Sequence, residues 1–392
     1  MISAVTLRGV EVNFRDDPRW GEFVSSHPEA LIYHHPSYLA ALEREYGQKC
    51  RALACEDSNG QLRAILPLFY SKGFPFKLGR SANGSRFSSL PRTPFGGPLA
   101  LDDEATSAVL RQAIELVRAQ PGVQLEIKSR HEGLDRLVPE LACVPWKSTY
   151  VEQLPPQIEA GGWEEFCEEV RLPRECGPCN ECKKLRFGNA KQQHRVNWAV
   201  NKAIKLGLQV REAETEAEIS EWYWLYLDAM RHHAFPPRPK RFFLDLWANV
   251  RPLGQMKLLI AELEENGSKR MVAGSIFLRL GQTVFYAFTG CAHRDFHLHP
   301  HDIIQMESIR NSCKNGYRWY DFGEATEDPQ GLAQFKGKWG TEPKRLYRYY
   351  YPAPVEGYAS KPSRLVSLAR QTWRSLPLGL TAKLGEQIHR YM

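Results

Sequence analysis

The side chains best suited to chemistry lie near the end of the chain, in residues 317–351. An aromatic segment runs into Asp321 and Gly323, a polar loop leads to Phe335 and Lys336, and a second aromatic segment follows. A hairpin that only fills a core needs no carboxylate or lysine between its strands. We therefore expect a strand that ends at Asp321, a lysine-bearing turn and a closing strand, which together form one wall of a site.

A second pattern with chemical meaning is the run Cys176, Cys179 and Cys182, among nine cysteines in the chain. The C-x-x-C-x-x-C spacing brings three thiolates to one centre, as zinc or an iron–sulfur cluster requires. Cys167 or His194 would supply the fourth ligand. The N-terminal residues lack a secretory pattern, so a disulfide framework is not expected. We favour structural zinc over an iron–sulfur cluster, with free cysteines in a loop as the alternative.

Basic residues are concentrated directly after these cysteines. Residues 182–211 contain eight Lys or Arg and no Asp or Glu. Such a block favours an anionic partner, which is a phosphate-bearing donor, RNA or a membrane surface. Lys191, Arg195 and Lys202 are the candidates for contacts with donor phosphates or RNA. The alternative is a solvated helix face.

Histidines are dense between His293 and His301, but their pattern does not favour a metal site. Pro300 interrupts the series, and no carboxylate stands at ligand spacing, so we expect a polar loop before a helix over residues 302–315. Glycine-rich dinucleotide loops are also missing from the sequence, because no G-x-G-x-x-G follows a strand.

The elements that would position these residues repeat along the chain. Residues 51–56 and 62–70 read as strands joined by Asn59-Gly60, and residues 257–263 and 271–280 read as strands joined by Asn266-Gly267. Helices are expected near each pair, and their ranges are 36–47, 104–119, 190–206, 216–233 and 239–250. Strands 123–129 and 283–289 complete the two halves. This repetition predicts two related α/β units.

The ordered series of motifs resembles the FemAB-like branch of the GNAT acyltransferases. The resemblance spans most of residues 30–351 and leaves out the cysteine insert and the tail. Its pieces are Pro36-Ser37-Tyr38-Leu39 with Tyr46-Gly47, Ile65-Leu66-Pro67-Leu68, Gly96-Gly97-Pro98-Leu99, Lys205-Leu206-Gly207-Leu208, Asp321-Phe322-Gly323 and Phe335-Lys336 with Trp339-Gly340. It implies an α/β (α+β) protein of two tandem GNAT-like units, each a mixed, mostly antiparallel sheet flanked by helices.

We expect three parts on this basis. Residues 1–155 form the N-terminal unit, and residues 156–352 form the C-terminal unit with a Cys-rich insert at about 167–190. Residues 353–392 form a basic helical tail. Val366, Ala369, Trp373 and Leu376 lie on one helical face of that tail, so it docks on the body or makes weak membrane-surface contact.

The resemblance also implies a reaction, N-acyl transfer to an amine of a small molecule or peptide. The donor would be a CoA thioester, an acyl carrier protein or an aminoacyl-tRNA. A usual GNAT enzyme binds pyrophosphate through a Gly- and Arg-rich turn before a helix. This sequence has no clear example, so acyl transfer is implied without specifying acetyl-CoA.

The resemblance further assigns roles to individual residues. Lys336, directly after Phe335, would stabilise an oxyanion or a phosphate, although a surface lysine in a turn is the alternative. Asp321 would orient the attacking amine or cap the following turn, and Glu324 is a weaker candidate of the same kind. Phe335 and Trp339 would contact substrate. Tyr286 would line the acceptor groove from its strand, with a core position as the alternative.

Composition limits the remaining possibilities. The chain has 392 residues, 43% hydrophobic and 11% aromatic content and a formal charge of +7, which suits two packed domains. No apolar run is long enough to span a membrane, and a soluble, cytoplasmic protein is expected. The rival class is a non-catalytic GNAT pair that binds RNA or a partner through the basic helix and the cysteine knuckle.

Overall fold

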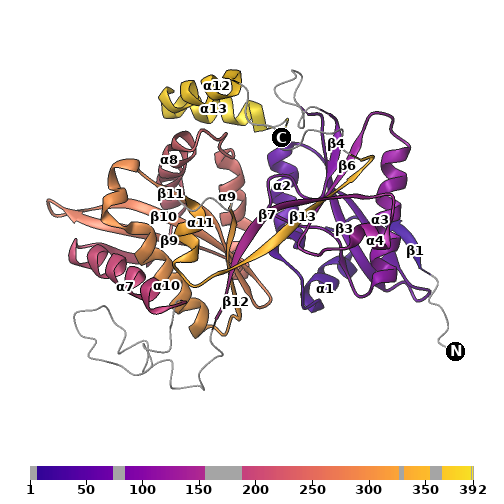
Figure 1. Cartoon of the computed structure of the whole chain (residues 1–392), viewed down its shortest axis with the longest axis horizontal. Coiled ribbons are helices and arrows are strands. Elements are labelled where there is room, and N and C mark those ends of the chain that lie inside the picture. Colours follow the sequence, from indigo (N-terminus) through magenta and orange to yellow (C-terminus); the bar gives the residue numbers. More distant parts are fainter. Residues whose placement is uncertain are drawn as a thin grey trace. The chain divides into compact units, whose positions relative to one another are not determined.

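A computed structural model of the chain describes residues 7–73, 84–154, 188–325, 331–353, 364–389 and 391 (Figure 1). The chain divides into two compact units. The first unit comprises residues 1–147 and 345–392, and the second unit comprises residues 148–344. The chain therefore passes from one unit to the other twice, within strand β7 (Ala142–Gln153) and within strand β13 (Glu342–Tyr351).

The first unit is built on a mixed sheet with the strand order β1-β2-β3-β4-β6-β13, and β5 pairs with β3. Its further strands are β1 (Arg8–Glu11), β2 (Arg51–Glu56), β3 (Leu62–Ser71), β4 (Arg86–Ser88), β5 (Leu99–Ala100) and β6 (Gln124–Ser129). Its helices are α1 (Pro18–Ser26), η1 (Ile32–His34), α2 (Pro36–Tyr46), α3 (Asp103–Arg118), α4 (Leu134–Leu137), α12 (Arg364–Ser375) and α13 (Leu378–His389).

Local sequence explains several of these elements. Helix α2 begins with proline at its first position and ends at Gly47, whose φ of 65° is left-handed and suits glycine. Strands β2 and β3 form the hairpin expected around Asn59-Gly60. Helix α3 places Val109, Leu110 and Val117 in the core against β2, β3 and β6.

The second unit is built on a mixed sheet with the strand order β7-β12-β11-β10-β9-β8. Its further strands are β8 (Gln209–Glu212), β9 (Met256–Glu265), β10 (Ser268–Leu280), β11 (Thr283–Cys291) and β12 (Trp319–Ala325). Its helices are α7 (Ala190–Lys205), α8 (Glu216–His232), α9 (Lys240–Asn249), η3 (Arg251–Leu253), η4 (His293–Leu298), α10 (Pro300–Lys314) and α11 (Leu332–Gly337).

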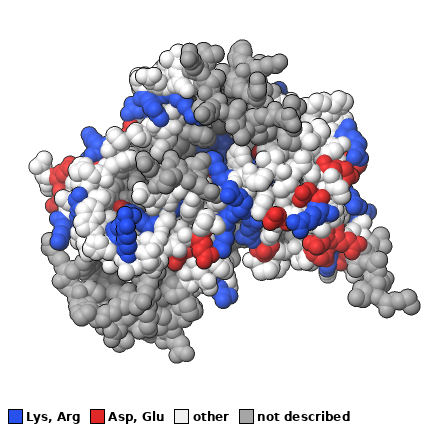
Figure 2. Space-filling view, viewed as in Figure 1, with Lys and Arg blue, Asp and Glu red and all other residues white. Residues whose placement is uncertain are grey.

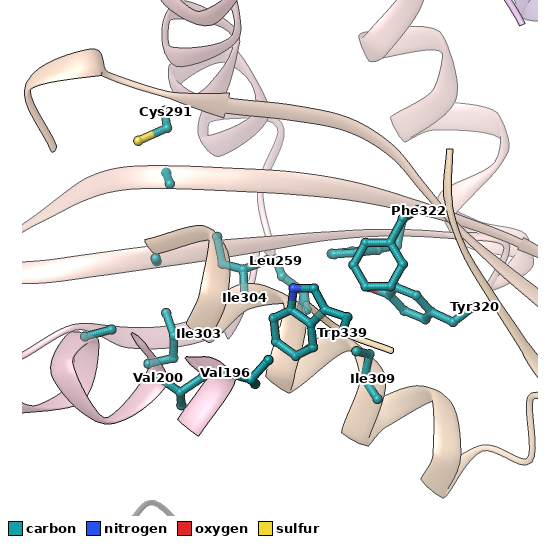
Figure 3. Close-up of a cluster of buried hydrophobic side chains, with 14 of the residues drawn as sticks. Val196, Val200, Leu259, Cys291, Ile303, Ile304, Ile309, Tyr320, Phe322 and Trp339 are labelled. Atoms are coloured by element: carbon teal, nitrogen blue, oxygen red, sulfur yellow. The ribbon is translucent and has the colours of Figure 1, made fainter. Parts of the chain in front are cut away.

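Helices cover both faces of this second sheet. Side chains alternate along a strand, so neighbouring residues of β10 face opposite sides. The Trp222 indole of α8 donates to the Gly274 carbonyl at 2.8 Å on one face. On the other face, Phe277 belongs to the core that α7 and α10 close with residues such as Val200 and Ile304 (Figure 3).

The two sheets share one plan, which confirms the predicted fold class. In the first unit an antiparallel hairpin leads to β4, and β4 pairs in parallel with β6 after helix α3. In the second unit an antiparallel hairpin leads to β11, and β11 pairs in parallel with β12 after helix α10. The other pairs described in these sheets are antiparallel.

Three details expected for residues 317–351 are wrong. Strand β12 continues beyond Asp321, because a bulge accommodates Gly323 with its left-handed φ of 76°. Phe335 and Lys336 lie in helix α11 and not in a turn. The two aromatic strands also do not form a hairpin, since β12 lies between β11 and β7 while β13 pairs with β6.

Candidate functional site

Strands β11 and β12 diverge in the second unit, and the candidate site lies where they separate. They pair in parallel through Thr283, Val284 and Phe285 of β11. Beyond that point these two described strands no longer pair with each other. Strand β11 stays paired with β10, and β12 pairs with β7. Backbone groups at such an edge are available to a ligand that carries amide groups.

The bulge in β12 lies at this divergence, and Asp321 stabilises it. The register between β12 and β7 shifts between Asp321 and Glu324. Asp321 Oδ1 accepts from the Gly323 backbone N–H at 2.7 Å and from the Thr149 hydroxyl at 2.5 Å. The buried carboxylate therefore caps the bulge with hydrogen bonds to its charged form.

Lys336 brings a positive charge to the same bulge. It lies near the end of α11 and is buried. Its Nζ donates to the Gly323 carbonyl at 2.8 Å and to the Glu324 carbonyl at 3.0 Å. It also lies 6.0 Å from the centroid of the Tyr150 ring. An ammonium group in such surroundings exerts a stronger field than it would in water.

The other residues proposed for substrate contact occupy different places. Tyr286 of β11 stacks on Phe277 with ring centroids 5.6 Å apart, and burial raises the pKa of its phenol. Phe335 of α11 lies edge-on to His301 at 6.5 Å. Trp339 is fully buried 6.0 Å from Phe322, in the middle of the apolar cluster of Figure 3. Tyr286 and Phe335 thus lie near polar groups, whereas Trp339 packs in the core.

A polar network under α10 was not anticipated from the sequence. Ser275 Oγ of β10 and Thr289 Oγ1 of β11 are 3.0 Å apart, and Thr289 Oγ1 lies 3.3 Å from His301 Nδ1. Burial lowers the pKa of His301 to about 4, so its imidazole is neutral near pH 7. The signal that sequence reasoning passed over is the i, i+4 spacing of His301 and Gln305 on the inner face of a helix.

Gln305 extends this network toward β12. The Tyr320 hydroxyl donates to Gln305 Oε1 at 2.6 Å, and both side chains are fully buried. Gln305 Nε2 is buried and has no hydrogen-bond partner among the described residues. Buried polar groups are normally paired, so an unpartnered donor indicates a place for a ligand or a water molecule.

The basic residues proposed to contact the phosphates of the donor, or RNA, lie on α7, which packs against α10. Lys191 and Arg195 are exposed, and Lys202 lies 5.0 Å above the ring of Trp198. Trp198 is itself 53% exposed and meets His299 edge-on at 5.1 Å. The helix thus presents cations and one aromatic ring to solvent near the start of α10.

The N-terminal turn of α10 already holds a carboxylate. Asp302 is buried there and forms an ion pair with Lys338, and its Oδ2 lies 3.6 Å from His299 Nδ1. A helix N-terminus attracts anions because its free N–H groups and its dipole are positive. Asp302 supplies that negative charge from within the chain.

The predicted metal ligands Cys167, Cys176, Cys179 and Cys182 lie outside the described residues. His194, the alternative fourth ligand, is exposed on α7. Within the described ranges, no group of three or more His, Cys, Asp or Glu residues is arranged to hold a metal ion. The same ranges contain no helix that is long and apolar enough to cross a bilayer. Zinc at the cysteine cluster stays a prediction.

Comparison with known proteins places this geometry in context. Residues 190–336 match the profile of the family described as acetyltransferase (GNAT) domain, and the match ends at Lys336. No curated protein matches the chain in sequence.

Several solved structures share the fold. FemX superposes with a TM-score of 0.63 at 14% identity, covering 88% of this chain and 97% of FemX. The C-terminal domain of a candidate lysylphosphatidylglycerol synthetase from Agrobacterium fabrum gives 0.56 at 11% identity, covering 92% and 96%. L-PGS from Bacillus licheniformis gives 0.50 at 11% identity, covering 86% and 96%. Identities this low establish a common fold and no more.

Proposed function

We propose that the protein is an N-acyltransferase, because residues 190–336 match the GNAT acetyltransferase family and the chain shares its fold with FemX. An acceptor amine would attack the carbonyl carbon of an activated thioester or ester. A C–N bond forms, the C–S or C–O bond to the donor breaks, and the amine proton leaves to the departing group or to water. The transferred group is acetyl, acyl or aminoacyl, and the acceptor is a small molecule or a peptide.

The observation that carries this proposal is the buried ammonium group of Lys336 at the β12 bulge. Attack on a carbonyl places negative charge on its oxygen, and a fixed positive charge lowers the barrier to that step. Lys336 is held by two backbone carbonyls where β11 and β12 diverge. Its positive charge would stabilise the oxyanion of a donor bound at that edge.

The remaining candidates take supporting roles in this proposal. Asp321 fixes the shape of the bulge and supplies negative charge that would orient the acceptor amine, with Glu324 beside it in the strand. Tyr286 and Phe335 would contact the acyl group from β11 and α11. Trp339 would act indirectly, because it packs behind Phe322.

The donor is proposed to bind through the basic face of α7. The carboxylate of Asp302 disfavours a pyrophosphate at the N-terminus of α10, because like charges repel there. Lys191, Arg195 and Lys202 would instead contact the anionic part of the donor. A CoA thioester, a carrier protein and an aminoacyl-tRNA all fit this description, and contact with RNA belongs to the third case.

A second function keeps some support from the same geometry. Lys336 and Asp321 both bond to the backbone of the bulge, so both stabilise the fold even if the protein catalyses no reaction. A non-catalytic GNAT pair that binds RNA or a partner would need no more than this. The two functions differ in whether the positive charge of Lys336 acts on a reacting substrate.

The test begins with the small molecules and RNA that co-purify with the full chain, identified by mass spectrometry. Transfer is then assayed with acetyl-CoA and with aminoacyl-tRNA as donors and a panel of amines as acceptors. We expect acylated amine with the wild type and a loss of at least about 100-fold in Lys336→Met. A folded Lys336→Met, Asp321→Asn double variant that transfers at the wild-type rate would exclude this site.

A further inference from the structure

The helical hairpin of α12 and α13 exposes leucines that a tail docked on the body would cover. Leu368 of α12 is 61% exposed, and Leu380 and Leu384 of α13 are 42% and 37% exposed. Leu380 and Leu384 are four residues apart, so they lie on one side of α13. Thr381, which is 1% exposed, lies on a different side of that helix. The three exposed leucines are called the leucine surface below.

The same hairpin carries a surplus of positive charge. Arg370, Arg374 and Lys383 are exposed, and Glu386 is the one acidic residue in the described part of the two helices. Residues 357–392 as a whole contain six Lys or Arg and one acid. Basic side chains, blue in Figure 2, lie at the top of the view, where Figure 1 shows α12 and α13. The hairpin that carries the leucine surface is therefore positively charged.

Trp373 of α12 adds an independent observation. Its indole N–H is buried and has no hydrogen-bond partner among the described residues. A buried donor without an acceptor is unfavourable in the present packing. Tryptophan is stable where its ring is in an apolar layer and its N–H meets polar groups, which is the situation at the headgroup level of a bilayer.

We propose that the α12–α13 hairpin binds the surface of an anionic lipid bilayer. The helices would lie flat, with the leucine surface in the acyl boundary and the three cations at lipid phosphates. An anionic lipid surface can take the exposed leucines into its acyl layer and match the net positive charge of these helices at its phosphates. The proposal is independent of any acyl-transfer activity.

The small apolar area and the positive charge of the hairpin determine how its lipid binding depends on lipid charge and salt. Three partly exposed leucines supply limited apolar burial, so attraction between the cations and anionic lipids must contribute much of the affinity. That attraction is screened by salt. Binding should therefore be reversible, should require anionic lipid and should weaken as ionic strength rises.

The experiment is flotation of the full chain with vesicles of phosphatidylcholine alone or mixed with an equal part of phosphatidylglycerol. We expect flotation with the mixed vesicles at low salt, and little with phosphatidylcholine alone. The triple variant Leu368→Ser, Leu380→Ser, Leu384→Ser should lose at least about ten-fold in binding. Arg370→Gln with Lys383→Gln should weaken binding and flatten its salt dependence.

Matched controls use leucines of similar exposure elsewhere. Leu101, at 50% exposure in the first unit, and Leu253, at 54% in the second, should change to serine without effect on flotation. Circular dichroism checks that the triple variant stays folded. Absence of binding to the mixed vesicles overturns the proposal, and so does a triple variant that binds normally. A wild-type dimer in light scattering that the triple variant loses would assign the leucine surface to a second copy instead.

Discussion

The ammonium group of Lys336 lies 2.8 Å from the carbonyl oxygen of Gly323 and so ties α11 to the bulge of β12. Gly323 is the left-handed residue of that bulge, and its own N–H is held by Asp321. The backbone N–H and C=O of one glycine residue are thus held by side chains of opposite charge. Lys336 and Asp321 therefore stabilise the bulge and also place charge beside it. Suitable variants test these two roles separately.

Replacing Lys336 by methionine tests both functions at once. The side chain is buried, and its loss leaves the carbonyls of Gly323 and Glu324 without this donor. We expect a loss of about 1–3 kcal/mol in the free energy of unfolding, measured in urea. Acyl transfer should fall by about 10²–10³, because the fixed positive charge is gone.

Lys344→Met is the matched control for this variant. Lys344 lies in β13 and pairs with Glu342 at 2.6 Å, with its side chain 55% exposed. Exposed pairs contribute little, so the change should stay within about 0.5 kcal/mol. Equal losses of stability in the two variants would contradict the special position of Lys336.

Asp321 allows the cap and the charge to be tested apart. Asp321→Asn keeps an Oδ1 acceptor for the Gly323 N–H and the Thr149 hydroxyl but removes the negative charge. Asp321→Ala removes both and leaves the Gly323 N–H unpaired, so it should cost about 1–3 kcal/mol in urea unfolding. We expect the asparagine variant to lose activity while retaining most of its stability. An active asparagine variant would leave Asp321 with the capping role alone.

Much of the fold was predictable because its signals are local. The turns Asn59-Gly60 and Asn266-Gly267 correctly predict two hairpins, since each needs residues that adopt left-handed backbone conformations. The helices ending near Gly47 and Gly207 were expected from periodicity and a terminal glycine, and both are confirmed. The expectation that the two aromatic strands pair with each other is wrong for a different reason. Alternation predicts that β12 and β13 are strands, but their partners β7 and β6 are far away in the sequence.

The site was less predictable, because it depends on tertiary contacts. Lys336 and Asp321 drew attention through their aromatic surroundings, but nothing local indicated that both bond to the backbone of Gly323. Thr289 gave no signal, since single polar residues in apolar elements are common, and the four-residue spacing between His301 and Gln305 is only a weak signal. Their significance comes from the contact of Thr289 with His301 and from the burial of Gln305 against Tyr320, which only the folded chain creates.

His301 is expected to stay neutral across the physiological range. Burial is the main cause that lowers its pKa to about 4, and Lys338 and His233 add to the effect while Asp302 opposes it. In ¹⁵N NMR of the full chain labelled at histidine, the His301 nitrogens should show no protonation down to about pH 5. Thr289→Val removes the hydroxyl near Nδ1 and should change the tautomer signal. Titration near the ordinary histidine value would show that the half-buried imidazole of His301 is not desolvated enough to lower its pKa.

The basic face of α7 predicts how donor binding depends on salt. If the donor carries RNA, neutralising Lys191, Arg195 and Lys202 with glutamine should weaken its binding and lower the salt slope by about 2, at about 0.7 per phosphate contact. Fluorescence anisotropy at several salt concentrations measures both quantities. Arg111→Gln, on α3 of the first unit, is a control that should leave the slope unchanged. A slope unaffected by the triple change would remove α7 from donor binding.

Stability should fall with rising pH because of Glu152. Burial, followed by the nearby carboxylate of Glu342, raises the pKa of Glu152 to about 7. The pKa of Glu342 is lowered by its hydrogen bond to Lys344, so Glu342 stays charged. A carboxyl group whose pKa is raised by folding binds its proton more tightly in the native state. Its contribution is therefore fully present below about pH 4.5 and is lost as pH rises through about 7.

Glu152→Gln removes this titration while keeping the shape of the side chain. Thermal unfolding of wild type and variant should give similar midpoints near pH 5, whereas near pH 8 the variant should unfold a few degrees higher. The advantage has this sign because the wild type must ionise a half-buried carboxylate beside Glu342 at high pH. Glu11→Gln, in β1 of the first unit, should show no such gain, since Glu11 pairs with Arg51. A Glu152→Gln variant with the same pH dependence as the wild type would show that Glu152 is ionised throughout this range.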